Sequence, residues 1–195
     1  MLDLPLTHHF VVRENEAYMK LLGREKIQFA NALFIMRIPG PIHNMIQQYK
    51  YHGDQRIGKW CGLLFGKQLQ KQSLIHTVDV IVPVPIHPKK LNRRGFNQTE
   101  VFARAISKQT NIPVNSQALC KRMDNHSQTH MTRTNRIINT MNSFVLNDTG
   151  ELYSKHILLV DDVLTTGATL EACIIQLKKI PNVRISIGII AMTKS

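Results

Sequence analysis

Residues 157–169 read ILLVDDVLTTGAT, and this stretch predicts the fold of the chain. Its first four residues are apolar, which is typical of a strand buried on both faces. We therefore expect Asp161 and Asp162 at the rim of the core, where that strand ends. The small residues that follow predict a tight turn with uncovered backbone N–H groups. From Leu170 apolar residues recur at helical spacing, so a helix should begin there with its positive end towards the turn.

This order of strand, acid pair, turn and helix predicts a site for a molecule with both hydroxyl groups and a phosphate. The carboxylates of Asp161 and Asp162 can accept hydrogen bonds from sugar hydroxyls, while the turn amides and the helix end can bind the phosphate. A ribose 5-phosphate unit has both groups. The alternative is an ordinary α/β connection in which the acids only cap a helix. We favour a binding site because the three features occur together in this order.

The same stretch resembles the motif with which type I phosphoribosyltransferases bind 5-phosphoribosyl-1-pyrophosphate (PRPP). Residues 49–54 (YKYHGD) and 82–100 (VPVPIHPKKLNRRGFNQTE) are similar to segments of the ComF family, the competence-associated and GntX-like branch of that fold. The resemblance covers roughly residues 40–195. It implies an α/β fold with a mainly parallel sheet and helices on both faces. The alternation of strand and helix patterns predicts the same architecture.

The resemblance also implies an activity, the transfer of a phosphoribosyl group from PRPP, with bound Mg²⁺, to an acceptor that the sequence does not identify. In such a reaction pyrophosphate leaves and positive charge develops on the ribose, so the protein supplies positioning and electrostatics rather than a covalent nucleophile. The expected catalytic residues are Asp161, Asp162, Arg133 and Arg136, and the two acids would contact Mg²⁺ through water. The expected PRPP-binding residues are Val160, Asp161, Asp162, Thr165, Thr166, Gly167, Ala168, Thr169, Pro83, Val84, Pro85 and Arg94.

A second strand pattern, residues 78–82, ends at three residues whose prolines predict a rigid loop, Pro83-Val84-Pro85. Ligands of α/β proteins bind at such strand ends, and a basic cluster that includes Arg94 follows at once. The resemblance implies that this region binds the pyrophosphate of PRPP, and the alternative is an exposed, solvated helix face. Residues 121–136 are polar and basic, which predicts a lid that closes over the ligand.

The composition favours one globular domain with an excess of positive charge. The chain has 195 residues, is 43% hydrophobic and carries a formal net charge of +12. Residues 86–136 hold ten basic and two acidic residues, which is +8 of that charge. This clustering predicts a polyanionic ligand or nucleic acid. The rival function is therefore a non-catalytic accessory of DNA uptake that keeps the fold and binds single-stranded DNA through its basic surface.

Other classes of protein are disfavoured by missing patterns. No GxxxxGK[ST] motif indicates a P-loop, and the acid pair follows a late strand, unlike the acids of a response regulator. The three cysteines form no CxxC pair, which argues against a zinc site and fits a reducing cytoplasm; Cys173 lies on an apolar stripe and is expected in the core. No apolar run approaches the ~20 residues needed to span a membrane. We expect a cytoplasmic protein, and a homodimer is left open.

The beginning of the chain carries little pattern. We divide the sequence into an N-terminal extension with an edge strand, residues 1–40, and a phosphoribosyltransferase-like domain, residues 41–195. Residues 1–25 predict an extended lead-in, with His8 and His9 at the surface rather than on a metal. Many ComF proteins begin with a CxxC…CxxC zinc ribbon, and nothing of that kind precedes Ile27 here. Either the ribbon was lost or it lies before this sequence, so its functions are not carried over.

Helices and strands around the site follow from apolar spacing. A helix is expected to begin at Pro41, and its end at Lys50 is interpreted as solvated, with a phosphate contact as the alternative. A second helix over residues 57–72 is expected to turn Trp60, Leu63, Leu64 and Leu69 inward. Residues 114–119 predict a short strand.

Overall fold

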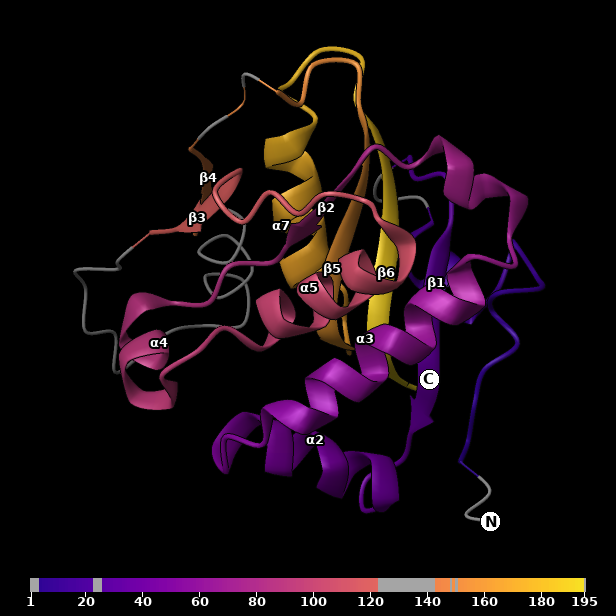
Figure 1. Cartoon of the computed structure of the whole chain (residues 1–195), viewed down its shortest axis with the longest axis vertical. Helices are drawn as coiled ribbons and strands as arrows, with labels where there is room; N and C mark the ends of the chain where they lie inside the picture. The colour runs from indigo at the N-terminus through magenta and orange to yellow at the C-terminus, as the bar shows by residue number, and fades with distance from the viewer. Residues whose placement is uncertain (1–3, 23–25, 123–142, 148, 150, 195) are drawn as a thin grey trace.

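The computed structural model describes residues 4–22, 26–122, 143–147, 149 and 151–194. Its centre is a four-stranded, fully parallel sheet in the order β1-β6-β5-β2 (Figure 1). The strands are β1 (Ala30–Met36), β2 (Val80–Pro83), β5 (His156–Leu164) and β6 (Arg184–Thr193). Parallel strands are covered on both faces, which explains the continuous apolar run at the start of β5. The predicted α/β architecture is confirmed.

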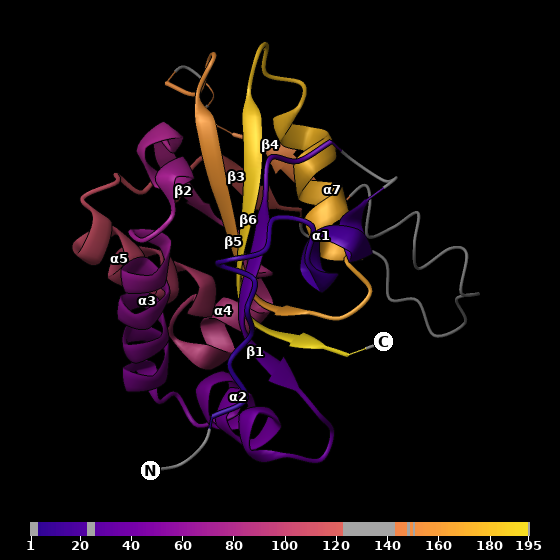
Figure 2. The ribbon, with the colours of Figure 1, turned by 90° about the vertical axis from the view of Figure 1, so that its right-hand side faces the viewer.

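Helices cover both faces of this sheet (Figure 2). One face packs against α2 (Pro41–Tyr51), α3 (Gln55–Leu69) and α5 (Gln98–Thr110). The other face packs against α1 (Glu16–Leu21) and α7 (Ala168–Leu177). The remaining elements are η1 (Ser73–Thr77), α4 (Pro88–Arg94) and an antiparallel pair of short strands, β3 (Leu119–Lys121) and β4 (Phe144–Leu146). This three-layer arrangement places the carboxyl ends of β2 and β5 side by side.

Close packing of α3 against α5 decides which side of α3 is buried. A Cβ atom added at Gly62 would lie 2.4 Å from the Cβ of Ala105, so the two helices touch through a glycine face. Trp60 and Leu63 therefore lie on the outer side of α3, where they are 44% and 40% exposed. The prediction that both side chains point inward was wrong. Trp60 instead stacks on Phe34, with ring centroids 5.9 Å apart.

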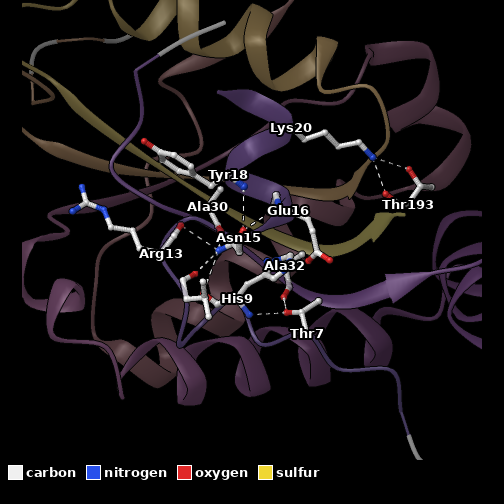
Figure 3. Close-up of polar contacts among 12 residues, drawn as sticks. Thr7, His9, Arg13, Asn15, Glu16, Tyr18, Lys20, Ala30, Ala32 and Thr193 are labelled. Atoms are coloured by element: carbon white, nitrogen blue, oxygen red, sulfur yellow. Dashed lines mark hydrogen bonds and ion pairs between the residues drawn. The ribbon is translucent and has the colours of Figure 1, made fainter. Parts of the chain in front are cut away.

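The N-terminal segment binds along the free edge of β1 (Figure 3). Asn15 caps α1 by accepting hydrogen bonds from two first-turn amides, and its Nδ2 donates to the carbonyl of Ala30 at 2.9 Å. His9 is buried, and its ring nitrogens contact Glu16 at 2.8 Å and the amide of Ala32 at 3.3 Å. Burial lowers the pKa of His9. The prediction of a surface His9 in an extended lead-in was wrong, because this residue covers polar backbone that a bare edge strand would leave unpaired.

Several smaller predictions can be compared with the structure. Residues 114–119 do not form a strand: Val114 makes one isolated bridge to Ile81, and β3 begins only at Leu119. Cys173 lies in the core as expected, and none of the three thiols is in a disulfide. The edge strand β1 belongs to the same sheet as β5, while the division of the chain at residue 40 stays a prediction. Across the described residues, the helices are all too short or too polar to cross a membrane.

Candidate functional site

A cleft of about 300 Å³ opens at the carboxyl ends of β2 and β5. It is bordered by the end of α2, the loop after β2, the helices α4 and α5, and the turn after β5. Its lining residues are Lys50, Tyr51, Val84, Pro85, Ile86, His87, Lys90, Arg94, Asn97, Gln98, Thr99, Lys121, Phe144, Asp161, Asp162, Val163, Thr165 and Thr169. The two regions that the sequence predicts to bind one ligand therefore meet at one cleft.

Because β2 ends before β5, the acid pair borders the cleft. Pro83, the last residue of β2, is in register with Val160, whose carbonyl accepts a hydrogen bond from the amide of Val84 at 2.9 Å. Beyond this point β5 is paired only with β6, and it continues to Leu164. Asp161 and Asp162 thus lie within the strand rather than after it, which corrects the expected strand end. The cause is that two apolar residues, Val163 and Leu164, extend the pairing with β6.

Asp161 is the more deeply buried acid of the pair, at 8% exposed. Its Oδ1 accepts a hydrogen bond from the amide of Asp162 at 2.8 Å. Burial, and then the neighbouring charge of Asp162, raise the pKa of Asp161 to about 7, against the opposing effect of Lys50 and Lys121. A carboxyl with such a pKa is sensitive to any cation or hydrogen-bond donor that enters the cleft.

Asp162 forms an ion pair with the end of α2. The Nζ atom of Lys50 lies 2.9 Å from Oδ1 of Asp162, and the two side chains are only 22% and 13% exposed. The interpretation of Lys50 as a solvated helix end was therefore wrong. The sequence could not place this contact, because it depends on how α2 packs against the sheet; the similarity of residues 49–54 to a family segment was the available signal.

The loop after β2 is held by the start of α5. The carbonyl of Val84 accepts hydrogen bonds from Oγ1 of Thr99 at 2.5 Å and from Nδ2 of Asn97 at 3.3 Å. Asn97 also caps α5, accepting from the amide of Thr99. These bonds fix the orientation of Pro85 beside the cleft, so the loop is preorganised by side chains as well as by its prolines.

The turn after β5 has the form of an anion-binding loop. Gly167 adopts φ 84°, a left-handed conformation that glycine tolerates best, and α7 begins at the next residue without a side-chain cap. Thr165 is exposed, and both Thr165 and Thr169 line the cleft. The amides of the first helical turn and these hydroxyls can therefore bind phosphate oxygens.

Two hydrogen-bond donors in the cleft have no acceptor among the described residues. They are Nε of Arg94 and Nε2 of Gln98, and Gln98 is only 2% exposed. The guanidinium of Arg94 also lies over the ring of Tyr51, 5.1 Å from its centroid. Buried donors without acceptors are unfavourable, so these two groups would favour oxygen atoms that enter the cleft.

The predicted site residues divide into three groups. Seven line the cleft: Asp161, Asp162, Thr165, Thr169, Val84, Pro85 and Arg94. Five support it from β2, β5 and the turn: Val160, Thr166, Gly167, Ala168 and Pro83. Arg133, Arg136 and all but the start of the predicted lid lie outside the described residues. Sequence reasoning missed Gln98 as a cleft residue, gave Lys50 only as an alternative phosphate contact, and placed Lys121 in the predicted lid.

The donor set suits a hydrated Mg²⁺ that arrives with a phosphorylated ligand. Mg²⁺ prefers carboxylate oxygens and keeps several waters, commonly with one or two protein carboxylates and substrate phosphates. The cleft offers two carboxylates, of which Asp162 is already bonded to Lys50. Within the described ranges no group of three or more His, Cys, Asp or Glu could hold a metal ion. Asp161 and Asp162 are therefore the residues that would hold the ion, together with oxygens of the ligand.

The parallel sheet, the acid pair and the glycine turn before α7 define a class, the type I phosphoribosyltransferase-like proteins. A family model described as a phosphoribosyl transferase domain matches residues 97–193. The chain is 28% identical over 145 residues to Competence protein F of Haemophilus influenzae and 29% identical over 166 residues to Competence protein ComFC of Bacillus subtilis. It is 26% identical over 132 residues to the DNA utilization protein YhgH of Escherichia coli. The chain is a ComF-family protein.

These alignments cover a larger share of this chain than of each relative. They include 72%, 85% and 66% of this chain but 63%, 65% and 57% of the three relatives, so the chain spans less than two thirds of each. Among solved structures, a purine phosphoribosyltransferase from Pyrococcus horikoshii is similar at 20% identity with a TM-score of 0.44, over 69% of this chain and 73% of that one.

Proposed function

We propose that the protein binds PRPP with Mg²⁺ and transfers its phosphoribosyl group to an acceptor still to be identified. The observation that carries this proposal is the meeting, at one cleft, of the acid pair of β5, the loop before α7 and the proline loop with its basic neighbours. These groups match the three parts of PRPP, which are the ribose hydroxyls, the 5-phosphate and the pyrophosphate. The family match supports the same assignment.

Each part of the cleft then has a defined task. The amides at the start of α7, with Thr165 and Thr169, bind the 5-phosphate and fix the ribose position. Asp161 and Asp162 accept hydrogen bonds from ribose hydroxyls or from water on the cation, and they stabilise positive charge on the ring. Arg94 binds the departing pyrophosphate. The bound Mg²⁺ would neutralise the negative charge of the pyrophosphate as the pyrophosphate leaves.

Calorimetric titration tests the proposal directly. The full chain should bind PRPP in the presence of Mg²⁺, and Asp162→Asn should weaken that binding by about tenfold or more, because a neutral amide loses charge-assisted hydrogen bonds. Glu151→Gln, which changes an exposed acid outside the cleft, is the matched control and should bind as the unmodified chain does. The proposal is refuted if the unmodified protein shows no binding at millimolar PRPP.

A second candidate function is a non-catalytic accessory of DNA uptake. A separate groove between α3 and α5 carries Lys59, Arg104 and Lys108, and the relatives are named for competence and DNA utilization. If phosphate neutralisation alone drives binding, single-stranded DNA should bind weakly and lose affinity steeply with salt. Tight binding that persists at high salt and does not respond to PRPP would favour this accessory function instead.

A further inference from the structure

The end of α2 contacts three different elements around the cleft through three consecutive side chains. The hydroxyl of Tyr49 donates to the carbonyl of Gln98 at 2.5 Å, at the start of α5. Lys50 pairs with Asp162 of β5, and the ring of Tyr51 lies under the guanidinium of Arg94 in α4. The position of Lys50 is therefore fixed by the bonds on either side of it.

The Lys50–Asp162 pair is largely shielded from solvent, with the two side chains 22% and 13% exposed. Removing one partner of a shielded pair leaves the other charge uncompensated. Lys50 thus serves as the counter-ion of Asp162. Any other cation that approaches Asp162 has to displace an ammonium group or share the carboxylate with it.

A ligand that carries both a divalent cation and phosphate groups removes this conflict. The cation, with its waters, can take the carboxylate of Asp162, and a phosphate oxygen can accept from the released ammonium of Lys50. Every charge then keeps a partner. A divalent cation alone offers Lys50 no new partner, so its binding leaves the ammonium uncompensated. Two further donors in the cleft, Nε of Arg94 and Nε2 of Gln98, await acceptors in the described structure, which favours the arrival of an oxygen-rich anion.

We propose that Lys50 is an exchangeable counter-ion that couples cation binding to phosphate binding. It opposes binding of a divalent cation to the acid pair when no phosphorylated ligand is present, and it binds phosphate oxygens when one is. This proposal deepens the proposed function, on which the identity of PRPP as the ligand rests. The coupling itself concerns any ligand that joins a divalent cation to a pyrophosphate group, and it can be measured without turnover.

The test uses Lys50→Met in the full chain, which removes the charge and keeps a similar apolar stem. Binding of Mn²⁺ alone, followed by electron paramagnetic resonance, should become about five- to tenfold tighter, the size of a typical coupling between sites. For pyrophosphate with Mg²⁺, followed by calorimetry, the lost contact with Lys50 offsets this gain, so the preference for cation with pyrophosphate over cation alone should fall about five- to tenfold. Lys67→Met, an exposed lysine of α3 outside both this cleft and the basic groove, should change neither affinity.

Tighter binding of Mn²⁺ without tighter binding of pyrophosphate with Mg²⁺ is the decisive result. If Lys50→Met leaves the Mn²⁺ affinity unchanged or lowers it, Lys50 is not an exchangeable counter-ion and the proposal is overturned. If this variant does not fold, Asp162→Asn tests the same ion pair by changing the other partner. Lys50 then has no carboxylate partner in the pair, so pyrophosphate without metal should bind at least as tightly as it binds to the unmodified chain. Weaker binding overturns the proposal. Failure of PRPP to bind while both effects hold for Mn²⁺ and pyrophosphate would reject only the proposed function.

Discussion

Replacing Asp161 with asparagine should make the protein more stable at neutral pH. Asp161 is 8% exposed and its pKa is raised from 3.8 to about 7, chiefly by burial. A raised pKa means that folding favours the neutral acid, so ionisation of Asp161 destabilises the folded state. An asparagine is neutral at every pH and can still accept the hydrogen bond from the amide of Asp162. The gain comes from removing a buried charge.

The size of the effect follows from the pKa. One pKa unit corresponds to about 1.36 kcal/mol, so a rise from 3.8 to about 7 sets an upper limit of roughly 4 kcal/mol. Relaxation and water entry reduce this value, and we expect about 1 to 3 kcal/mol. For a chain of this size, 1 kcal/mol raises the melting temperature by about 2–4 °C. The increase should therefore be readily measured.

The pH dependence separates this explanation from a packing effect. Below pH 3.8 the acid is neutral in both folded and unfolded states, so the variant has no advantage there. As the pH rises towards about 7, the unfolded chain ionises first, and the unmodified protein loses stability that the variant keeps. Above that pH the difference is constant. In urea unfolding, the free energy of unfolding of Asp161→Asn should thus exceed that of the unmodified protein by clearly more at pH 8.5 than at pH 5.

The matched control is Asp79→Asn at the other end of the sheet. Asp79 also accepts a backbone hydrogen bond, from the amide of His156 at 2.7 Å, but its side chain is 37% exposed. This control should not stabilise the protein, because the carboxylate of Asp79 is partly exposed and lies near Lys155. Equal or lower stability of Asp161→Asn at pH 8.5, or a gain that is the same at pH 5, would refute the reasoning from burial.

Two further variants test the packing of the fold by urea unfolding. Gly62→Val should destabilise the protein by about 2–4 kcal/mol, because its Cβ would lie 2.4 Å from that of Ala105; an unchanged midpoint would show that α3 and α5 separate easily. Asn15→Ala should lower the free energy of unfolding by about 2–3 kcal/mol, since it removes the cap of α1 and a buried donor to Ala30. A loss below 0.5 kcal/mol would mean that water replaces Asn15 at the edge of β1.

The sequence predicts the parts of the fold that depend on neighbours along the chain. The run before Asp161 predicts β5, the glycine turn predicts the start of α7, and the prolines after residue 82 predict the end of β2, because each signal acts within a few residues. The cleft could be predicted from these alone, since parallel strands place their carboxyl ends at one edge.

The errors share a physical cause, which is contact between segments distant in sequence. Lys50 looks like a solvated helix end until α2 is packed against β5, where Asp162 meets it. Trp60 looks like a core residue until Gly62 brings α3 against α5 and turns the indole outward. His9 looks like a surface residue until the N-terminal segment covers the edge of β1. Hydrophobic periodicity carries no information on such contacts.

The cleft brings together three features that are unfavourable for folding. Asp161 has a raised pKa. Asp162 pairs with the ammonium group of Lys50, which could otherwise bind phosphate, and Gln98 has a buried donor without an acceptor among the described residues. Each would be removed by an apolar or neutral substitution. The proposed ligand, which supplies a cation, hydroxyl groups and phosphate oxygens, would relieve all three together. Strain of this kind at the ends of two parallel strands is better explained by ligand binding than by folding, because no contact within the described structure requires the three features to coincide.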